Sequence, residues 1–241
     1  MKYMGSKNRL AKELVPIIQS YIDNSTVGYL EPFVGGANII DKIKHHNKIG
    51  CDINEYLIAL LKKVQSGFKF PDTISEDEYI NVRDNKDNFE DWYVGLVGFC
   101  ASYNAKFFGG YAGATKTKEG IRHYDREAIR NISKQAPNLK DIKFLKISFT
   151  ELPDHKIKGY VIYCDPPYRD TTKYEVESFP YEYFYDWCRR MSKDNIVLIS
   201  EYNMPDDFEC LWQKEHKTMV DSNKKTGDDS KIRIEKLFIA R

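Results

Sequence analysis

Four consecutive residues, Asp165-Pro166-Pro167-Tyr168, place an acid, two prolines and an aromatic ring directly after the apolar run at 160–164. Such a run of β-branched and aromatic residues is typical of a buried parallel strand. Proline cannot continue a strand ladder or a helix, because its φ is fixed and it lacks an N–H. We therefore expect a stiff turn at the carboxyl end of a strand, which is where open α/β sheets bind ligands.

This turn offers hydrogen-bond acceptors beside a flat ring. The carboxylate of Asp165 and the backbone carbonyl of Pro166 are acceptors, and Tyr168 adds an aromatic face. A planar amine, such as that of a nucleobase, has two N–H donors and a π face, so the turn is complementary to it. The alternative is an ordinary strand-ending turn that carries a surface acid.

Three further motifs precede this turn. They are Lys2-Tyr3-Met4-Gly5-Ser6-Lys7, Glu31-Pro32-Phe33-Val34-Gly35-Gly36 and Asp52-Ile53-Asn54. In content and order, the motifs resemble those of the Dam-like, alpha-group adenine-specific DNA methyltransferases, over nearly the whole chain. The resemblance implies transfer of a methyl group from S-adenosyl-L-methionine to the exocyclic 6-amino group of adenine in double-stranded DNA, with the base flipped out. A role in restriction-modification or as an orphan enzyme stays open.

The resemblance also implies the site residues. Those of catalysis are Asp165, Pro166, Pro167 and Tyr168, with Tyr168 stacking on the flipped base. Those that bind the cofactor are Tyr3, Lys7, Phe33, Gly35, Asp52, Phe149 and Asp165.

The residues themselves support part of this cofactor set. A strand at 27–30, a glycine turn and a helix around 39–43 form a Rossmann-type opening. The turn is not Gly-x-Gly-x-x-Gly, which favours a compact nucleoside cofactor over a dinucleotide. An acid such as Asp52, some 15–20 residues after such a turn, commonly binds ribose hydroxyls, although it could instead cap the helix that starts near Asn54. Lys7 meets an anion, in this family the methionine carboxylate, or is a solvated lysine.

Residues 67–140 differ in character from the flanking sequence, because strand signals fade while charged and aromatic residues become frequent. Cations bind phosphates and amides read base edges, so this segment suits a DNA surface. The alternative is a helical subdomain with a solvated charged face. In the family this is the target-recognition segment, and we expect DNA contacts from Tyr103, Asn104, Lys106, Lys116, Lys118 and Arg122.

The predicted fold class is α/β, a Rossmann-like methyltransferase sheet with an inserted, mainly helical target-recognition module. We expect the catalytic domain at 1–66 and 141–241 and the module at 67–140. The helices are predicted at 7–22, 39–43, 56–64 and 181–191, and the strands at 27–30, 48–52, 143–147, 160–164 and 196–200. An antiparallel pair is predicted at 208–212 and 232–239, and polar loops at 169–178 and 221–231.

Net charge, cysteine content and the length of apolar runs restrict the partners, metal content and location that we expect for this protein. The chain has 241 residues and a net charge of +1, so a nucleic-acid surface would be a local patch. Its five cysteines form no Cys-x-x-Cys pair, and we expect free thiols and no metal site. No apolar run approaches the length of a membrane span and no signal peptide is evident. We expect a cytoplasmic protein of a bacterial or phage-infected cell, either a monomer or a weak dimer.

Other functions remain as alternatives. An RNA adenine methyltransferase would use the same chemistry, as would a protein-amide methyltransferase, although Asp rather than Asn before Pro166 disfavours the amide. A cofactor-binding DNA regulator without catalysis is expected to lack Lys7, Asp52 or Asp165, and all three are present. A small-molecule dehydrogenase conflicts with the glycine pattern.

Overall fold

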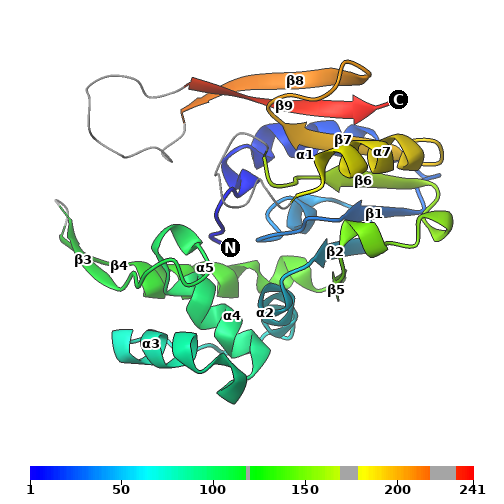
Figure 1. Ribbon diagram of the computed structural model, residues 1–241. Helices are drawn as coiled ribbons and strands as arrows, with labels where there is room; N and C mark the ends of the chain where they lie inside the picture. Colours follow the sequence, from blue (N-terminus) through cyan, green and yellow to red (C-terminus); the bar gives the residue numbers. More distant parts are fainter. Residues whose placement is uncertain (118–119, 169–178, 218–231) are drawn as a thin grey trace. The chain divides into compact units, whose positions relative to one another are not determined.

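The computed structural model describes residues 1–117, 120–168, 179–217 and 232–241 (Figure 1). Its chain divides into two compact units. The first contains Met1–Gln19 and Pro32–Leu152, and the second contains Ser20–Glu31 and Pro153–Arg241. Both units mix helices with strands, and the strands are mainly parallel.

The first unit opens with a 3-10 turn, η1 (Lys7–Arg9), and the helix α1 (Ala11–Ser20). The hydroxyl of Ser6 caps η1 by accepting a hydrogen bond from the Asn8 N–H at 3.2 Å. The predicted helix at 7–22 is thus a short turn followed by a shorter helix. Strand β2 (Lys48–Asp52) pairs in parallel with β5 (Ile142–Lys146), and α2 (Glu55–Gln65) follows β2.

The helix predicted at 39–43 was wrong, because the structure has only the 3-10 turn η2 (Ile40–Lys42) there. Ile43 is already extended, with ψ at 133°, and β2 begins at Lys48. Ile39, Ile40 and Ile43 are nevertheless buried in the core. Their apolar character therefore indicated burial correctly, but not a helix.

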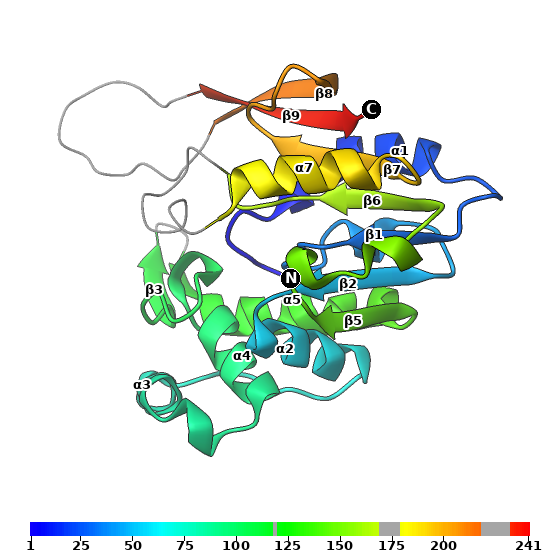
Figure 2. The same ribbon diagram turned by 45° about the vertical axis from the view of Figure 1, so that its right-hand side comes forward.

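The rest of the first unit is helical apart from one hairpin. Its elements are α3 (Glu76–Asp84), η3 (Lys86–Asn88), α4 (Asp91–Cys100), η4 (Tyr103–Ala105), β3 (Ala114–Thr117), β4 (Gly120–His123), α5 (Tyr124–Leu139) and η5 (Phe149–Glu151). Figure 2 shows α2, α4 and α5 side by side. Helix α4 approaches α2 closely at Gly95, where an added Cβ would lie 2.2 Å from the Tyr56 carbonyl oxygen. Only glycine fits this contact.

The antiparallel hairpin β3–β4 was not expected. Its residues are mostly exposed and lack apolar alternation, so the sequence carries no strand signal there.

The second unit is a sheet with the helix α7 (Tyr181–Met191) packed against it (Figure 2). Its strands lie in the order β1 (Gly28–Glu31), β6 (Tyr160–Cys164), β7 (Ile196–Glu201), β9 (Ile232–Ala240), β8 (Phe208–Lys217). β1, β6 and β7 are parallel, whereas β9 is antiparallel to β7 and to β8. A short turn, η6 (Asp154–Lys156), precedes β6. The predicted buried strand before Asp165 and the predicted antiparallel pair are confirmed.

Buried thiols were expected at Cys51 and Cys164, and both are free and buried. Burial raises the pKa of the Cys51 thiol to about 12. Within the described ranges, no helix is both long and apolar enough to cross a membrane.

Candidate functional site

The glycine turn is tied to the end of β2 by one carboxylate. The Asp52 Oδ2 accepts a hydrogen bond from the Gly35 N–H at 3.2 Å, and Oδ1 accepts one from the Asn54 N–H at 3.0 Å. Beside them the Val34 N–H donates to the Cys51 carbonyl at 2.7 Å. The side chain of Asn54 accepts from the Leu57 N–H and caps α2. Asp52 is therefore not the helix cap, and it lies where the glycine turn and a strand end meet.

Burial raises the pKa of Asp52, although the N–H groups of Asn54 and Gly35 act in the opposite direction. Each carboxylate oxygen already accepts a backbone hydrogen bond, and a carboxylate has about four acceptor positions in all. Capacity remains for hydroxyl donors such as those of a ribose.

The Tyr3 ring lies against the glycine turn. Gly35 has a φ of +46°, and a Cβ there would lie 2.9 Å from the Tyr3 Cε1. A side chain at this position would be strained and would also displace the ring. Glycine at this position therefore lets the Tyr3 ring pack directly against the backbone of the turn.

Two further predicted cofactor residues meet as an aromatic pair. The rings of Phe33 and Phe149 have centroids 5.4 Å apart at an interplanar angle of 45°. Phe149 is buried at the start of η5, where Ser148 forms a capping box with Glu151.

Lys7 is not a solvated lysine. Its exposed fraction is 8%, and its Nζ donates to the Gly5 carbonyl at 3.4 Å. A buried ammonium needs anionic or carbonyl partners, because desolvation of a charge is costly. Burial of this cation near the start of the chain is consistent with an anion-binding role. All the predicted cofactor residues except Asp165 lie in the first unit.

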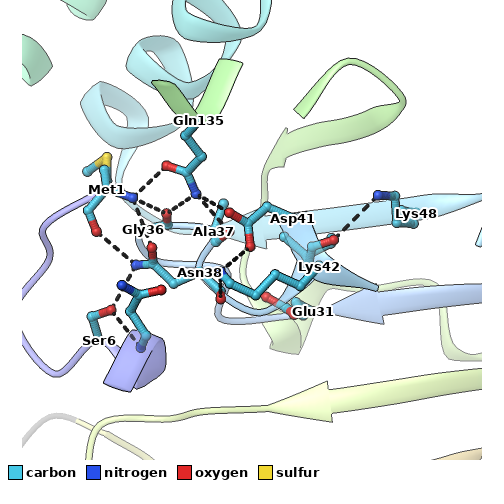
Figure 3. A network of polar contacts seen from close by, with 12 residues as sticks. Met1, Ser6, Glu31, Gly36, Ala37, Asn38, Asp41, Lys42, Lys48 and Gln135 are labelled. Atoms are coloured by element: carbon cyan, nitrogen blue, oxygen red, sulfur yellow. Dashed lines mark hydrogen bonds and ion pairs between the residues drawn. The ribbon is translucent and has the colours of Figure 1, made fainter. Parts of the chain in front are cut away.

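A polar network behind the glycine turn was not predicted (Figure 3). The Asn38 Nδ2 donates to the Met1 carbonyl at 2.9 Å and to the Ser6 Oγ at 2.8 Å. The Gln135 Nε2, from α5, donates to the carbonyls of Gly36 and Ala37. Neither Asn38 nor Gln135 stands out in the sequence, because a buried amide side chain is recognised only once its hydrogen-bond partners are known.

The Asp165-Pro166-Pro167-Tyr168 turn lies in the second unit, directly after β6. Pro166 is buried and Pro167 is exposed. The Pro167 carbonyl accepts a hydrogen bond from the Tyr181 hydroxyl at 3.0 Å. No donor within the described part of the chain bonds the Pro166 carbonyl. Among the described residues, the acceptor predicted for an amine accepts no hydrogen bond, whereas the next carbonyl accepts one from Tyr181.

Tyr168 is anchored at both its ring and its hydroxyl. It is 7% exposed, and its ring meets that of Tyr202 edge-on with centroids 4.6 Å apart. Its hydroxyl donates to the Glu235 Oε1 on β9. Burial raises the pKa of Tyr168, and the charges of Asp165 and Glu235 raise it further. Stacking on a flipped base stays a prediction, and it requires one face of this ring to be uncovered.

Glu235 was missed by the sequence reasoning. It follows Ile234 at a position where the alternation of β9 predicts a polar, solvent-facing residue, yet it is 3% exposed.

The predicted DNA-contacting residues lie mostly at exposed positions of the first unit. Tyr103 is 65% exposed, and Asn104 has a φ of +54° in the turn η4. Lys106 is exposed, and so is Lys116, which is opposite Ile121 in the hairpin.

Two of the predicted cations, Arg122 and Lys118, differ from these exposed residues. Arg122 bonds the Glu127 Oε2 at 2.6 Å and lies over the Tyr124 ring, so its charge is already partly paired. Lys118 lies outside the described residues.

Among the residues that the structure describes, no group of three His, Cys, Asp or Glu side chains is arranged to hold a metal ion.

We expect Tyr168→Phe to lower the free energy of unfolding by about 1–3 kcal/mol, because it removes a buried hydroxyl that donates to the Glu235 carboxylate. The matched control is Tyr183→Phe on α7, whose side chain is 44% exposed. The control should change stability by less than about 0.5 kcal/mol. Urea denaturation measures both, and equal midpoints for the two variants would contradict the anchoring role of Glu235.

Comparison with known proteins agrees with this geometry. The Type II methyltransferase M.FokI of Planomicrobium okeanokoites is 22% identical over 204 residues, which are 71% of this chain and 29% of that protein. The chain thus spans less than a third of this relative's length. The family described as D12 class N6 adenine-specific DNA methyltransferase matches residues 3–217. The chain therefore belongs to the D12 class N6 adenine-specific DNA methyltransferase family.

Proposed function

We propose that this protein transfers a methyl group from S-adenosyl-L-methionine to the exocyclic 6-amino group of adenine in double-stranded DNA. The observation that carries the proposal is the intact Asp-Pro-Pro-Tyr turn at the end of β6. It presents the Asp165 carboxylate beside a Pro166 carbonyl that has no hydrogen-bond donor in the described structure. Family membership supports the same reaction.

The turn addresses the main difficulty of the reaction. The adenine amine is a poor nucleophile, because its lone pair is delocalised into the ring. If Asp165 accepts one N–H and the Pro166 carbonyl accepts the other, both bonds favour a more tetrahedral and nucleophilic nitrogen. The acceptors are fixed in advance by the two prolines, so they need little reorganisation when positive charge develops.

Asp165 need not act as a base before transfer, because methylation itself makes the amine acidic. Its negative charge stabilises the positive charge that develops on the nitrogen. The carboxylate then lies within reach of the proton that leaves.

The residues around the glycine turn fit the cofactor. S-adenosyl-L-methionine, when bound, supplies an electrophilic methyl group on a sulfonium. Asp52 would accept from the ribose hydroxyls with the acceptor capacity that its two backbone bonds leave. Tyr3 and the Phe33–Phe149 pair would contact the adenosine, and Lys7 would bind the carboxylate.

We assign DNA binding to the exposed residues of η4 and the hairpin, including Tyr103, Lys106 and Lys116. The target amine lies inside a duplex, so the base must be flipped out. Stacking of the flipped base on an aromatic ring is worth about 1–3 kcal/mol, and we assign this contact to Tyr168. The name of the relative M.FokI supports a place in restriction-modification, and residues 67–140 would form the target-recognition module.

Two alternatives use the same residues. An RNA adenine methyltransferase would methylate RNA and not duplex DNA, and a regulator would bind cofactor and DNA without transfer. Incubation with tritiated S-adenosyl-L-methionine and each nucleic acid, followed by identification of the modified base, separates all three.

Asp165→Ala should abolish methyl incorporation into duplex DNA and leave the fold intact, because the prolines hold the turn. Asp165→Asn should be severely slowed, since a charge-assisted hydrogen bond is roughly twice as strong as a neutral one. The measurement is tritium incorporation, with circular dichroism as the check on folding. Full activity in Asp165→Ala, or methylated cytosine as the product, would falsify the mechanism.

Asp52→Ala should weaken binding of S-adenosyl-L-methionine, measured by calorimetry. In the wild type, the raised pKa of Asp52 means that its carboxylate is protonated at a higher pH than the ordinary value of about 3.9. Cofactor affinity should therefore fall as the pH is lowered, starting above that value, and Asp52→Asn should lose this pH dependence. An unchanged affinity in Asp52→Ala would refute the ribose assignment.

Replacing Lys116, Lys118 and Arg122 together by glutamine should weaken binding to mixed-sequence duplex DNA. The slope of log K against log salt should fall by up to about 0.9 for each phosphate that the variant no longer neutralises. The control replaces Lys12, Lys62 and Lys140, which are exposed lysines outside the hairpin, and removes the same charge. If the two triple variants show the same slope, the hairpin is not the DNA surface.

A further inference from the structure

One buried side chain of α5 bonds the glycine turn at several points. The Gln135 Nε2 donates to the Gly36 carbonyl at 3.2 Å, the Ala37 carbonyl at 3.0 Å and the Asp41 Oδ2 at 2.8 Å. Its Oε1 accepts from the Met1 amine at 2.5 Å. Figure 3 shows the amide between the turn and the first residue of the chain. Gln135 is 7% exposed, so these bonds are shielded from water.

These bonds act on the backbone that Tyr3 and Asp52 also contact. Within the turn, the Gly35 N–H donates to the Asp52 carboxylate. The carbonyls of the next two residues, Gly36 and Ala37, accept hydrogen bonds from the Gln135 side chain. Ala37 has a φ of +54°, a conformation that a residue with a Cβ rarely adopts. Such a conformation persists only where surrounding contacts enforce it. The two carbonyl bonds from Gln135 contribute to that enforcement, together with the bond from the Ala37 N–H to the Val34 carbonyl.

Helix α5 is suited to hold the turn in place. It runs over Tyr124–Leu139 and buries Ala128, Ile129, Ile132 and Leu139. Glu127, near its start, pairs with Lys2 at 2.9 Å and with Arg122 of the hairpin at 2.6 Å. Exposed ion pairs of this kind contribute little, and they do not reach the glycine turn, whereas the hydrogen bonds of Gln135 reach it directly.

We propose that Gln135 is a positioning residue for cofactor binding, which holds the glycine turn in its binding conformation without touching the cofactor. This rests on the proposed function, namely that the turn at 33–37 binds S-adenosyl-L-methionine. Gln135 thereby makes α5, which directly follows the hairpin, part of the cofactor site.

The test compares two variants. Gln135→Met keeps the size of the side chain but removes its hydrogen-bond donors. Gln135→Glu keeps an acceptor oxygen but places a carboxylate against the carbonyls of Gly36 and Ala37 and the Asp41 carboxylate, which repel it. The matched control is Asn138→Met, which removes an exposed amide from the same helix. Calorimetry with S-adenosylhomocysteine measures affinity without turnover. The fitted stoichiometry reports the folded fraction, and Kd reports the site in the folded molecules.

We expect Kd to rise about tenfold in Gln135→Met, the size of effect that follows from removing a set of buried hydrogen bonds. Kd should rise further in Gln135→Glu and stay at the wild-type value in Asn138→Met. With duplex DNA and S-adenosyl-L-methionine, KM for the cofactor should rise in parallel while kcat at saturation is retained. If Gln135→Met does not fold, Gln135→Glu carries the same comparison.

A reduced stoichiometry with wild-type Kd in both Gln135 variants would overturn the proposal, because it would show a purely structural role. Failure of the wild-type protein to bind S-adenosylhomocysteine would instead overturn the proposed function on which the inference rests. The two failures are distinguished by the wild-type titration alone.

Discussion

The glycine turn at 33–37 is held by hydrogen bonds from two sides, and the first unit is arranged to supply them. Asp52 reaches the turn from the end of β2 and Gln135 reaches it from α5. The turn has little regular structure of its own, since the segment after it forms only a 3-10 turn. A backbone with positive φ at Gly35 and Ala37 would otherwise sample many conformations. Its binding shape therefore depends on these polar contacts.

The Asp-Pro-Pro-Tyr turn of the second unit, to which we assign catalysis, is stabilised by a different means. Its backbone is restricted covalently by Pro166 and Pro167, and its aromatic residue contacts Tyr202 and Glu235 later in the chain. The Tyr168 hydroxyl reaches Glu235 on β9, and the Tyr181 hydroxyl bonds the Pro167 carbonyl. A stiff turn can present acceptors without an entropic cost at the moment of reaction. In the proposed mechanism the Asp165 carboxylate serves the substrate, while the two prolines restrict the backbone of the turn.

The strands other than β3 and β4 were predictable because their signals are local, as were the helices α1, α2 and α7. The run at 160–164 and the antiparallel pair at the end of the chain follow directly from side-chain pattern. The helix expected at 39–43 failed, because buried isoleucines in a short connection mimic helical spacing. The exposed hairpin β3–β4 was missed for the opposite reason, since residues that face water leave no hydrophobic pattern.

The sequence by itself determined the residues on which the proposed chemistry rests, because the acid, the prolines and the tyrosine of the Asp-Pro-Pro-Tyr turn are adjacent in the chain and need no fold to meet. It also identified the glycine turn and Asp52, whose separation follows from consecutive elements. Only the tertiary structure revealed Gln135 and Glu235, which lie 99 and 67 residues from partners that they bond. A buried amide or carboxylate has the same sequence signature as a solvated one, and it becomes recognisable only when folding brings its partner within hydrogen-bond distance.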